Sequence, residues 1–473
     1  MPSPFRAAPD RRPRLRLAAV LLALAGAGCG GDATGPARDS APDPATNVPI
    51  PVDTEASAPL EAPDWLIARA GDATTTFEVS ERSYNLSARN VGLSARIRFA
   101  DGDEVFERFF TPEDGLGPDF NADGCNACHV NNGRQATAID GGYIGVGPVV
   151  HVSVAGATET EAPFVLPGYG NRLQGYALRG DPEALVNVLW EAVEGSYPDG
   201  TAFELRRPVV SVVGRDGMLP VDALLSLRIP TPVAGPGLLE FVPESDIVAA
   251  ADPDDEDGDG ISGEVQWVPD GAGGFRVGRH GWKAEHLDLI HQAAAALAGD
   301  MGVATSVVPD GATIELGDEE LADLAFYVEA LAIPGGRDIE DPEVIRGAVL
   351  FETIGCTGCH TPRQRTGTAN TPELDGLTII PFTDLLLHDL GPGLDDNRSV
   401  YAASGREWRT APLWGIGLLE TVNGHVSLLH DGRARSIEEA ILWHGGEAQH
   451  VTDAFMALDA ADRAAVLRFV ASR

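Results

Sequence analysis

The sequence predicts a mainly α-helical fold with two similar domains, the first of which is enlarged by a strand- and loop-rich insertion. The motif Cys-x-x-Cys-His occurs twice, at Cys125–His129 and at Cys356–His360. A run with helical spacing leads into each motif. Between residues 149 and 233 the pattern changes to short valine-rich segments broken by glycine and proline, which is typical of strands. The repeated motif therefore predicts the two domains, and the valine-rich segments predict the insertion.

Residues 1–28 have the features of a secretion signal. Arginines precede an apolar core at 17–27, which is too short to span a bilayer. The stretch Leu24–Cys29 resembles a bacterial lipobox, with Gly26 where leucine is usual. We favour lipidation of Cys29; the alternative is ordinary cleavage after a small residue. The expectation is an exported, periplasmic protein that is anchored to a membrane by lipid.

Residues 29–64 predict a disordered tether, and the charge of the chain restricts its partners. The tether has too few large apolar residues to offset the entropy cost of ordering. The formal net charge of -37 argues against nucleic acid and anionic membrane surfaces. It is compatible with a basic redox partner. Contact with a membrane is expected only through the lipid anchor.

Residues 65–336 form the predicted first domain, and residues 337–473 form the second. We expect strands within 75–98 and 208–213, and helices at 103–110, 286–298 and 319–331. Asp318 is expected to cap the last of these helices, Pro334 to end it, and two glycines then mark the boundary. In the second domain, Asp341 and Asp459 are expected to cap the first and last helices.

The two motifs predict covalently bound haem. Two thiols add to the haem vinyl groups and the adjacent imidazole reaches the iron, so one tight turn supplies all three groups. A zinc site would need cysteine pairs 231 residues apart to come together, and a redox dithiol would not need histidine after both pairs. With haem c, the domains have the layout of small cytochrome c domains. The expected haem-binding residues are Cys125, Cys128 and His129 for one haem, and Cys356, Cys359 and His360 for the other.

The sixth iron ligand decides whether a haem carries electrons or binds a small molecule. His444 follows a short helix that Ser436 and Glu439 begin as a capping box, and two glycines come after it. A histidine in this setting can be aimed at an iron. The alternative for His444 is a buried histidine at a helix end. No histidine follows the first motif at a convincing spacing; His151 is the nearest candidate.

Seven runs of the chain resemble the bacterial di-haem oxidoreductase family, also labelled "thiol oxidoreductase", which is related to the di-haem cytochrome c peroxidases. The resemblance covers roughly residues 90 to 473 and departs at His280 and Ala411, where phenylalanine and proline are expected. The runs are Gly115–Arg134, Asp257–Gly263, Gly278–Ala284, Thr383–Asp389, Glu407–Gly415, Leu429–Ala434 and Ile441–Ala448.

The resemblance implies different roles for the two haems. In the related peroxidases a turn histidine, matched by His430, precedes the sixth ligand of the electron-donating C-terminal haem. His444 falls at that ligand position, where those peroxidases carry methionine. The N-terminal haem would then be the reactive one, with Gln174 and either Glu191 or Glu194 moving protons on peroxide. These three residues could equally be ordinary polar surface.

Residues 255–260 resemble the start of a calcium-binding loop. Asp255, Asp257 and Asp259 stand at loop positions 1, 3 and 5, and Gly260 at position 6. Position 12 is Gln266 where an EF-hand has glutamate. The related peroxidases hold calcium between their haems, so calcium is predicted here, with a merely acidic loop as the alternative.

The sequence therefore predicts a peroxidase-like di-haem c-type oxidoreductase. Electrons are expected from a small donor protein of the cytochrome c or cupredoxin type, with peroxide as the substrate. The alternative is an electron carrier or redox sensor in which both irons have six ligands. Thiol chemistry is disfavoured because the motif cysteines would become thioethers.

Overall fold

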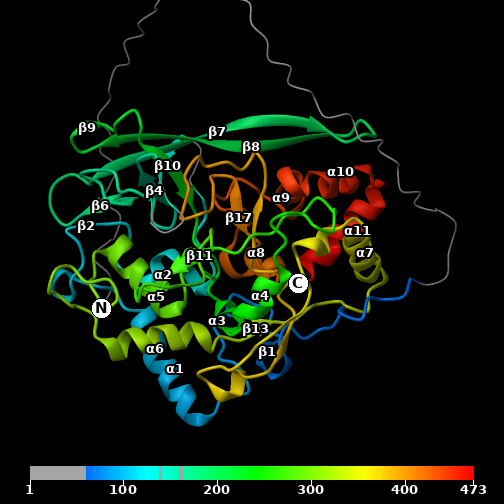
Figure 1. Ribbon diagram of the computed structural model, residues 1–473, viewed down its shortest axis with the longest axis horizontal. Helices are drawn as coiled ribbons and strands as arrows, with labels where there is room; N and C mark the ends of the chain where they lie inside the picture. Colours follow the sequence, from blue (N-terminus) through cyan, green and yellow to red (C-terminus); the bar gives the residue numbers. More distant parts are fainter. Residues whose placement is uncertain (1–59, 138–140, 157, 159–162) are drawn as a thin grey trace, which may run out of the picture. The chain divides into compact units, whose positions relative to one another are not determined.

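The computed structural model describes residues 60–137, 141–156, 158 and 163–473. Figure 1 labels its helices and strands. The α-helices are α1 (Leu93–Phe106), α2 (Cys125–Cys128), α3 (Pro236–Glu240), α4 (Glu244–Ala250), α5 (Leu289–Ala296), α6 (Asp318–Glu329), α7 (Pro342–Thr353), α8 (Leu419–Asn423), α9 (Ile437–Leu442), α10 (Gln449–Ala457) and α11 (Ala460–Ala471). The strands are β1 (Thr75–Thr76), β2 (Asp119–Phe120), β3 (Gly142–Tyr143), β4 (Val149–Ser153), β5 (Arg172–Leu173), β6 (Tyr176–Ala177), β7 (Ala184–Ser196), β8 (Ala202–Gly214), β9 (Gly217–Met218), β10 (Leu224–Arg228), β11 (Trp267–Pro269), β12 (Phe275–Val277), β13 (Ile333–Pro334), β14 (Gln364–Arg365), β15 (Thr378–Ile379), β16 (Leu387–Asp389) and β17 (Glu407–Arg409).

The expectation of a mainly α-helical fold is wrong. About 30% of the described residues are helical and 20% lie in strands, which form many small sheets. The long connections after both motifs cause the difference. After the second motif, for example, the described chain runs to residue 415 through β14–β17 and a single 3₁₀ turn. Short strand pairs hold the backbone of these connections, so the helices make up a smaller part of the chain than a cytochrome c layout predicts.

Two pairs of helices cross in the same way beside the two motifs. Helix α1 crosses α6, and α7 crosses α11 (Figure 1). Both crossings depend on a glycine: a Cβ on Gly102 would lie 2.0 Å from Asp323 O, and one on Gly347 would lie 1.9 Å from Ala465 O. Because no side chain separates the backbones there, each pair packs tightly. One motif follows α1 and the other follows α7.

The predicted strand-rich insertion is present and forms two sheets. The hairpin of β7 and β8 pairs in register from Ala184 with Gly214 to Ser196 with Ala202, and it runs along the top of Figure 1. A second sheet has the order β10-β4-β5. Valine and leucine side chains of both sheets share one apolar core, which includes Val150, Val188 and Leu227. The alternating valines that predict strands therefore supply the core of the insertion.

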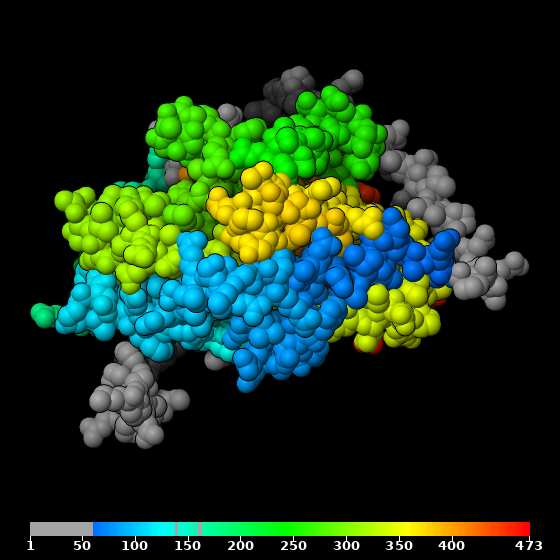
Figure 2. Space-filling view, turned by 90° about the horizontal axis from the view of Figure 1, so that it is seen from below, coloured from blue at the N-terminus to red at the C-terminus, as the bar shows by residue number. Residues whose placement is uncertain are grey.

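The first described residues pack on the C-terminal helices. The Trp65 ring lies 5.6 Å from that of Phe382 and 5.7 Å from that of Phe469, in the core of α7 and α11. Asn90 donates to Glu373 O at 2.6 Å. Figure 2 shows the blue N-terminal residues beside the yellow segment that follows the second motif. Residues before the first motif thus complete the core around α7 and α11.

Several expected element boundaries are confirmed and two are wrong. Asp341, Asp459 and Ser436 each accept a backbone N–H at the start of α7, α11 and α9, as expected. Asp318 is the first residue of α6, and Gly317 precedes it. The strands expected within 75–98 are reduced to β1, because α1 already begins at Leu93.

The predicted secretion signal, Cys29 and most of the predicted tether lie outside the described residues. None of the helices in the described part of the chain combines the length and the apolar character required to cross a bilayer.

Candidate functional site

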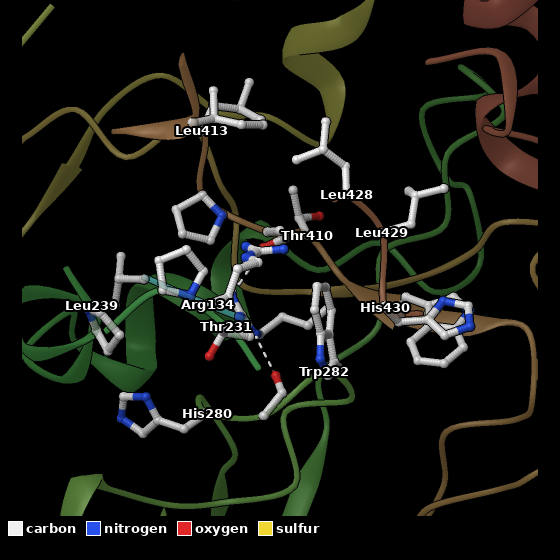
Figure 3. Close-up of a pocket in the computed structure, with 18 of the residues that line it drawn as sticks. Arg134, Thr231, Leu239, His280, Trp282, Thr410, Leu413, Leu428, Leu429 and His430 are labelled. Atoms are coloured by element: carbon white, nitrogen blue, oxygen red, sulfur yellow. Dashed lines mark hydrogen bonds between the residues drawn. The ribbon is translucent and has the colours of Figure 1, made fainter. Parts of the chain in front are cut away.

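Both Cys-x-x-Cys-His motifs open into one cavity of about 400 Å³. Its walls come from both halves of the chain and are mostly apolar, as is usual for a cofactor site. Figure 3 shows His280 and His430 on opposite sides of the view, with Arg134, Thr231 and Trp282 between them. The fold therefore brings together two motifs that are far apart in the sequence.

The two motifs have matching surroundings. In each, the backbone N–H of the histidine donates to the carbonyl of the first cysteine at 3.0 Å, which closes a tight turn. The Phe106 ring, at the end of α1, lies 6.4 Å from the His129 ring at 51°. The Phe351 ring of α7 lies 6.3 Å from the His360 ring at 50°. The structure thus repeats one arrangement of helix, aromatic ring and motif.

Three histidines of the cavity share one hydrogen-bond pattern. Nδ1 lies 2.9 Å from Thr231 O in His129, 3.0 Å from Phe382 O in His360, and 2.7 Å from Ala440 O in His444. A carbonyl oxygen can only accept, so Nδ1 carries the proton in each ring. The Nε2 lone pair is therefore free to bind a metal, and the second hydrogen bond fixes the ring.

The protonation states of these groups suit metal and thioether chemistry. Burial lowers the pKa of His129 and of His360 to about 4, and it lowers that of His444 as well. All three rings are therefore neutral at pH 7, as metal ligands must be. The four motif cysteines form no disulfide, so their thiols are free to add to vinyl groups. This set of thiols and imidazoles fits two haems.

The structure adds His280 to the cavity. Its ring is 5% exposed, and Nε2 has no hydrogen-bond partner. Nε2 lies 3.6 Å from Glu240 Oε2, and Glu240 is held by the backbone N–H of Leu289 at 2.8 Å. Burial lowers the pKa of His280; the pKa of Glu240 is also lowered, since its contact with His280 outweighs the effect of burial. The pair therefore combines a neutral imidazole with a carboxylate, which can hold and release a proton.

His388 lines the cavity but both of its ring nitrogens are occupied. Nε2 lies 2.9 Å from Asp384 Oδ2, and Nδ1 lies 2.9 Å from Glu447 Oε2. Burial alone would lower the pKa of His388, but the hydrogen bonds raise it well above its usual value. Glu447 also accepts from the backbone N–H of Ser262 at 3.0 Å, which links this wall to the acidic loop. His388 is therefore a charged structural link and a poor candidate for iron.

The acidic loop gathers a different set of carboxylates from the predicted one. Oxygen atoms of Asp252, Asp255 and Asp257 lie within 4.8 Å of one another. Asp259 is not part of this group, and it accepts from the backbone N–H of Ile261 at 2.8 Å. The loop ends against the second motif, where Ile261 lies beside Gly358. Three carboxylates at this spacing could hold a hard cation.

The predicted proton-transfer residues do not line the cavity. Gln174 donates to Gly299 O at 2.8 Å and is absent from the cavity wall. Glu191 and Glu194 are exposed on β7, where Glu191 pairs with Arg207 at 2.8 Å. His151 lies on β4, opposite Ser226 of β10, and is also absent from the cavity wall. The geometry gives none of these residues access to the His129 motif.

Sequence reasoning missed the residues that do line the cavity beside α5, namely His280, Gln292 and Asp300. They are far from the first motif in the sequence, so spacing alone could not associate them with it. One signal was available: His280 stands where the resemblance predicts phenylalanine. A polar residue in place of an apolar one inside a family run marks a site to examine.

A protein-family model described as "Di-haem oxidoreductase, putative peroxidase" matches residues 66–143, 161–316 and 310–473. The matched ranges contain both motifs, His280 and His444. No curated protein and no solved structure was found to match the chain.

Proposed function

Because this chain belongs to the di-haem oxidoreductase family, we propose that it is a c-type di-haem peroxidase. Family membership makes it an oxidoreductase with two haems. The finer proposal is that the motif cysteines attach both haems covalently. Electrons enter at the haem of His360, and peroxide is reduced at the haem of His129.

One asymmetry of the cavity carries this proposal. At the His360 end, His444 has the same hydrogen-bond pattern as the motif histidines and offers a free Nε2. Among the other described histidines of the wall, His388 and His430 are held by neighbours, and His280 lacks a backbone carbonyl partner. Two histidine ligands suit electron transfer, whereas an iron with one protein ligand can bind peroxide.

When bound, a haem with an open position binds peroxide and delivers the electrons; the reaction takes up two electrons and two protons and yields two waters. The chain has to fix the ligands and move the protons. Thr231 O and Phe382 O orient the two motif histidines. His280, with Glu240 beside it, is the group that can pass a proton from one peroxide oxygen to the other.

The remaining features of the proposal rest on the sequence. The donor is a small cytochrome c or cupredoxin with a basic surface, which the net charge of -37 would attract. The chain is exported to the periplasm and held by a lipid on Cys29. Calcium binds the acidic loop through Asp252, Asp255 and Asp257.

Low-temperature EPR of the ferric protein, combined with peroxide turnover using a reduced small cytochrome c, tests the function. We expect one high-spin and one low-spin haem, and oxidation of the donor by peroxide. Two low-spin haems without turnover would instead support the alternative of an electron carrier or redox sensor.

Thiol–disulfide exchange is not supported as a second function. Burial raises the pKa of Cys125, Cys128 and Cys356 to about 12, so the reactive thiolate form is scarce at pH 7.

A further inference from the structure

Eight arginines are buried in the described part of the chain, and three of them are paired with a carboxylate there; of the other five, Arg398 and Arg473 lie outside the cavity. The three pairs, each with an arginine side chain that is 2–7% exposed, are Arg228 with Asp396 at 3.1 Å, Arg433 with Asp431 at 2.7 Å, and Arg463 with Asp199 at 3.0 Å. Such pairing is expected, because an unpaired charge in the interior costs several kcal/mol.

The other three buried arginines without an ion pair all line the cavity wall. Arg134, Arg279 and Arg409 are 6%, 4% and 9% exposed. Within the described residues, no carboxylate oxygen lies within the 4.0 Å that would make an ion pair with any of them. They donate only to backbone carbonyls: Arg134 to Ser427 O at 3.0 Å, Arg279 to Leu239 O at 3.2 Å, and Arg409 to Gly281 O at 3.2 Å and Thr410 O at 3.1 Å.

Arg134 is the most isolated of the three. Its Nε has no hydrogen-bond partner. Burial lowers its pKa to about 10, so the guanidinium still carries its charge at pH 7. A buried cation that faces a cavity with a free donor is stabilised by an anion inside that cavity.

We propose that Arg134, Arg279 and Arg409 bind the propionate carboxylates of the two haems, with Arg134 serving the haem of His129. The proposal rests on the haem attachment proposed above and does not depend on peroxide turnover. Each haem carries two propionates, and the planar guanidinium is the side chain that best matches a carboxylate. Arg134 follows His129 by five residues. Burial is the main cause of the lowered pKa of His129, and the charge of Arg134 lowers that pKa further.

The same arginines connect segments that are distant in the sequence. Arg134 belongs to the first motif region, yet its guanidinium is held by Ser427 O near the C-terminus. Arg409 donates to Gly281 O, 128 residues earlier in the chain. Figure 3 shows Arg134 and Thr410 near the centre of the view, among the residues that line the cavity. Charges that neutralise the propionates would therefore lie where the two haem sites meet.

The test compares Arg134→Gln and Arg134→Lys with wild type in the haem-loaded protein, with Arg207→Gln on the exposed hairpin as the control. Spectroelectrochemical titration measures the midpoint potential of each haem between roughly pH 5 and pH 8. R134Q is expected to lower the potential of the His129 haem, since the lost positive charge no longer favours the reduced state. It should also make that potential depend on pH, because the propionate then takes up a proton on reduction. R134K should lie close to wild type, and R207Q should equal it.

An unchanged potential in R134Q would overturn the proposal. A wild-type potential that varies with phosphate or chloride concentration would assign the site to a free anion and would also overturn it. If R134Q does not accumulate, the wild-type protein decides: a pH-independent potential of the His129 haem supports a paired propionate, and a pH-dependent one contradicts it. Failure of the proposed peroxidase function is distinguishable from failure of this proposal: the protein would show no peroxide turnover, while the haem potentials would behave as expected here.

Discussion

The rings of Trp408 and His430 stack face to face in the cavity wall, 3.7 Å apart and within 6° of parallel. The ammonium group of Lys283 lies 4.1 Å from the centre of the Trp408 ring. Because the His430 ring covers one face of Trp408, Lys283 lies over the other face. Burial lowers the pKa of His430 to about 3. The stack therefore contains a neutral imidazole at pH 7, and the stability of the protein should depend on pH through this group.

His430→Phe should reduce the acid sensitivity of the protein while keeping an aromatic ring on Trp408. In the wild type, the unfolded chain takes up a proton below an ordinary histidine pKa of about 6.5, whereas folded His430 does not until about pH 3. This group therefore costs stability as the pH falls, about 2 kcal/mol between pH 7 and pH 5. Urea unfolding at pH 7 and pH 5 measures the free energy of unfolding, and its decrease between the two pH values should be smaller by this amount in the variant than in the wild type.

The control for that measurement is His450→Phe, because His450 is an exposed histidine outside the cavity wall. If His430→Phe and the wild type lose the same free energy of unfolding between pH 7 and pH 5, His430 is protonated in the folded protein.

His444→Met should raise the midpoint potential of the C-terminal haem, because a thioether ligand favours the reduced iron more than imidazole does. His444→Ala should convert the low-spin EPR signal of that haem to high-spin. His450→Ala is a matched control: its Nδ1 also bonds a backbone carbonyl, Glu447 O at 2.9 Å, but it does not line the cavity. A low-spin signal that persists in His444→Ala would exclude His444 as the ligand.

His280→Phe should lower kcat for peroxide by about 10²–10⁴-fold, the usual contribution of a positioned acid–base group. Glu240→Gln should lower it less and change the pH profile, since it removes only the carboxylate beside His280. Both variants should keep the visible spectra of the reduced haems, and stopped-flow turnover checks the rates. Full activity in His280→Phe would assign proton transfer elsewhere in the cavity.

Gly102→Ala and Gly347→Ala should each destabilise the protein by about 1–3 kcal/mol, because the added methyl group meets the backbone of the partner helix. Gly145→Ala has open space around its Cβ and should change the free energy of unfolding by less than about 0.5 kcal/mol. Urea titration measures all three. Equal effects at the three positions would contradict the role of the crossings.

Asp255→Asn should weaken calcium binding at least about tenfold, whereas Asp259→Asn should weaken it less. The first removes a charge from the group of three carboxylates, and the second changes a residue outside that group. Calorimetric titration of the chelator-treated protein measures the affinity. No heat of binding in the wild type would leave the loop as an acidic turn.

Local features could be predicted from the sequence because each depends on neighbouring residues. The motif turns, the caps at Asp341 and Asp459, and the hydrogen-bonded setting of His444 at the end of α9 all lie within one or two turns of chain. The alternating valines of β7 and β8 predict strands for the same reason.

The contents of the cavity could not be predicted, because they depend on contacts between distant segments. His280 reaches the cavity through strand-like pairing with His286 and contact with α3, and neither leaves a trace in local spacing. Glu191 illustrates the opposite error, since the sequence does not reveal that its side chain stays on the exposed face of a long hairpin. The fold class failed similarly, because two-residue strand pairs carry almost no sequence signal.

The packing of Trp65 against Phe469 closes a loop of 404 residues, from the start of the described chain to its last helix. Loops of this length are slow to close, and the contact cannot form until the final helix exists. The core of α7 and α11 must therefore wait for both ends of the chain. The surroundings of the first motif wait as well, because Arg134 is held by Ser427 O and Asn423 donates to Val130 O. Neither haem site should consequently be complete before the C-terminal segment is present.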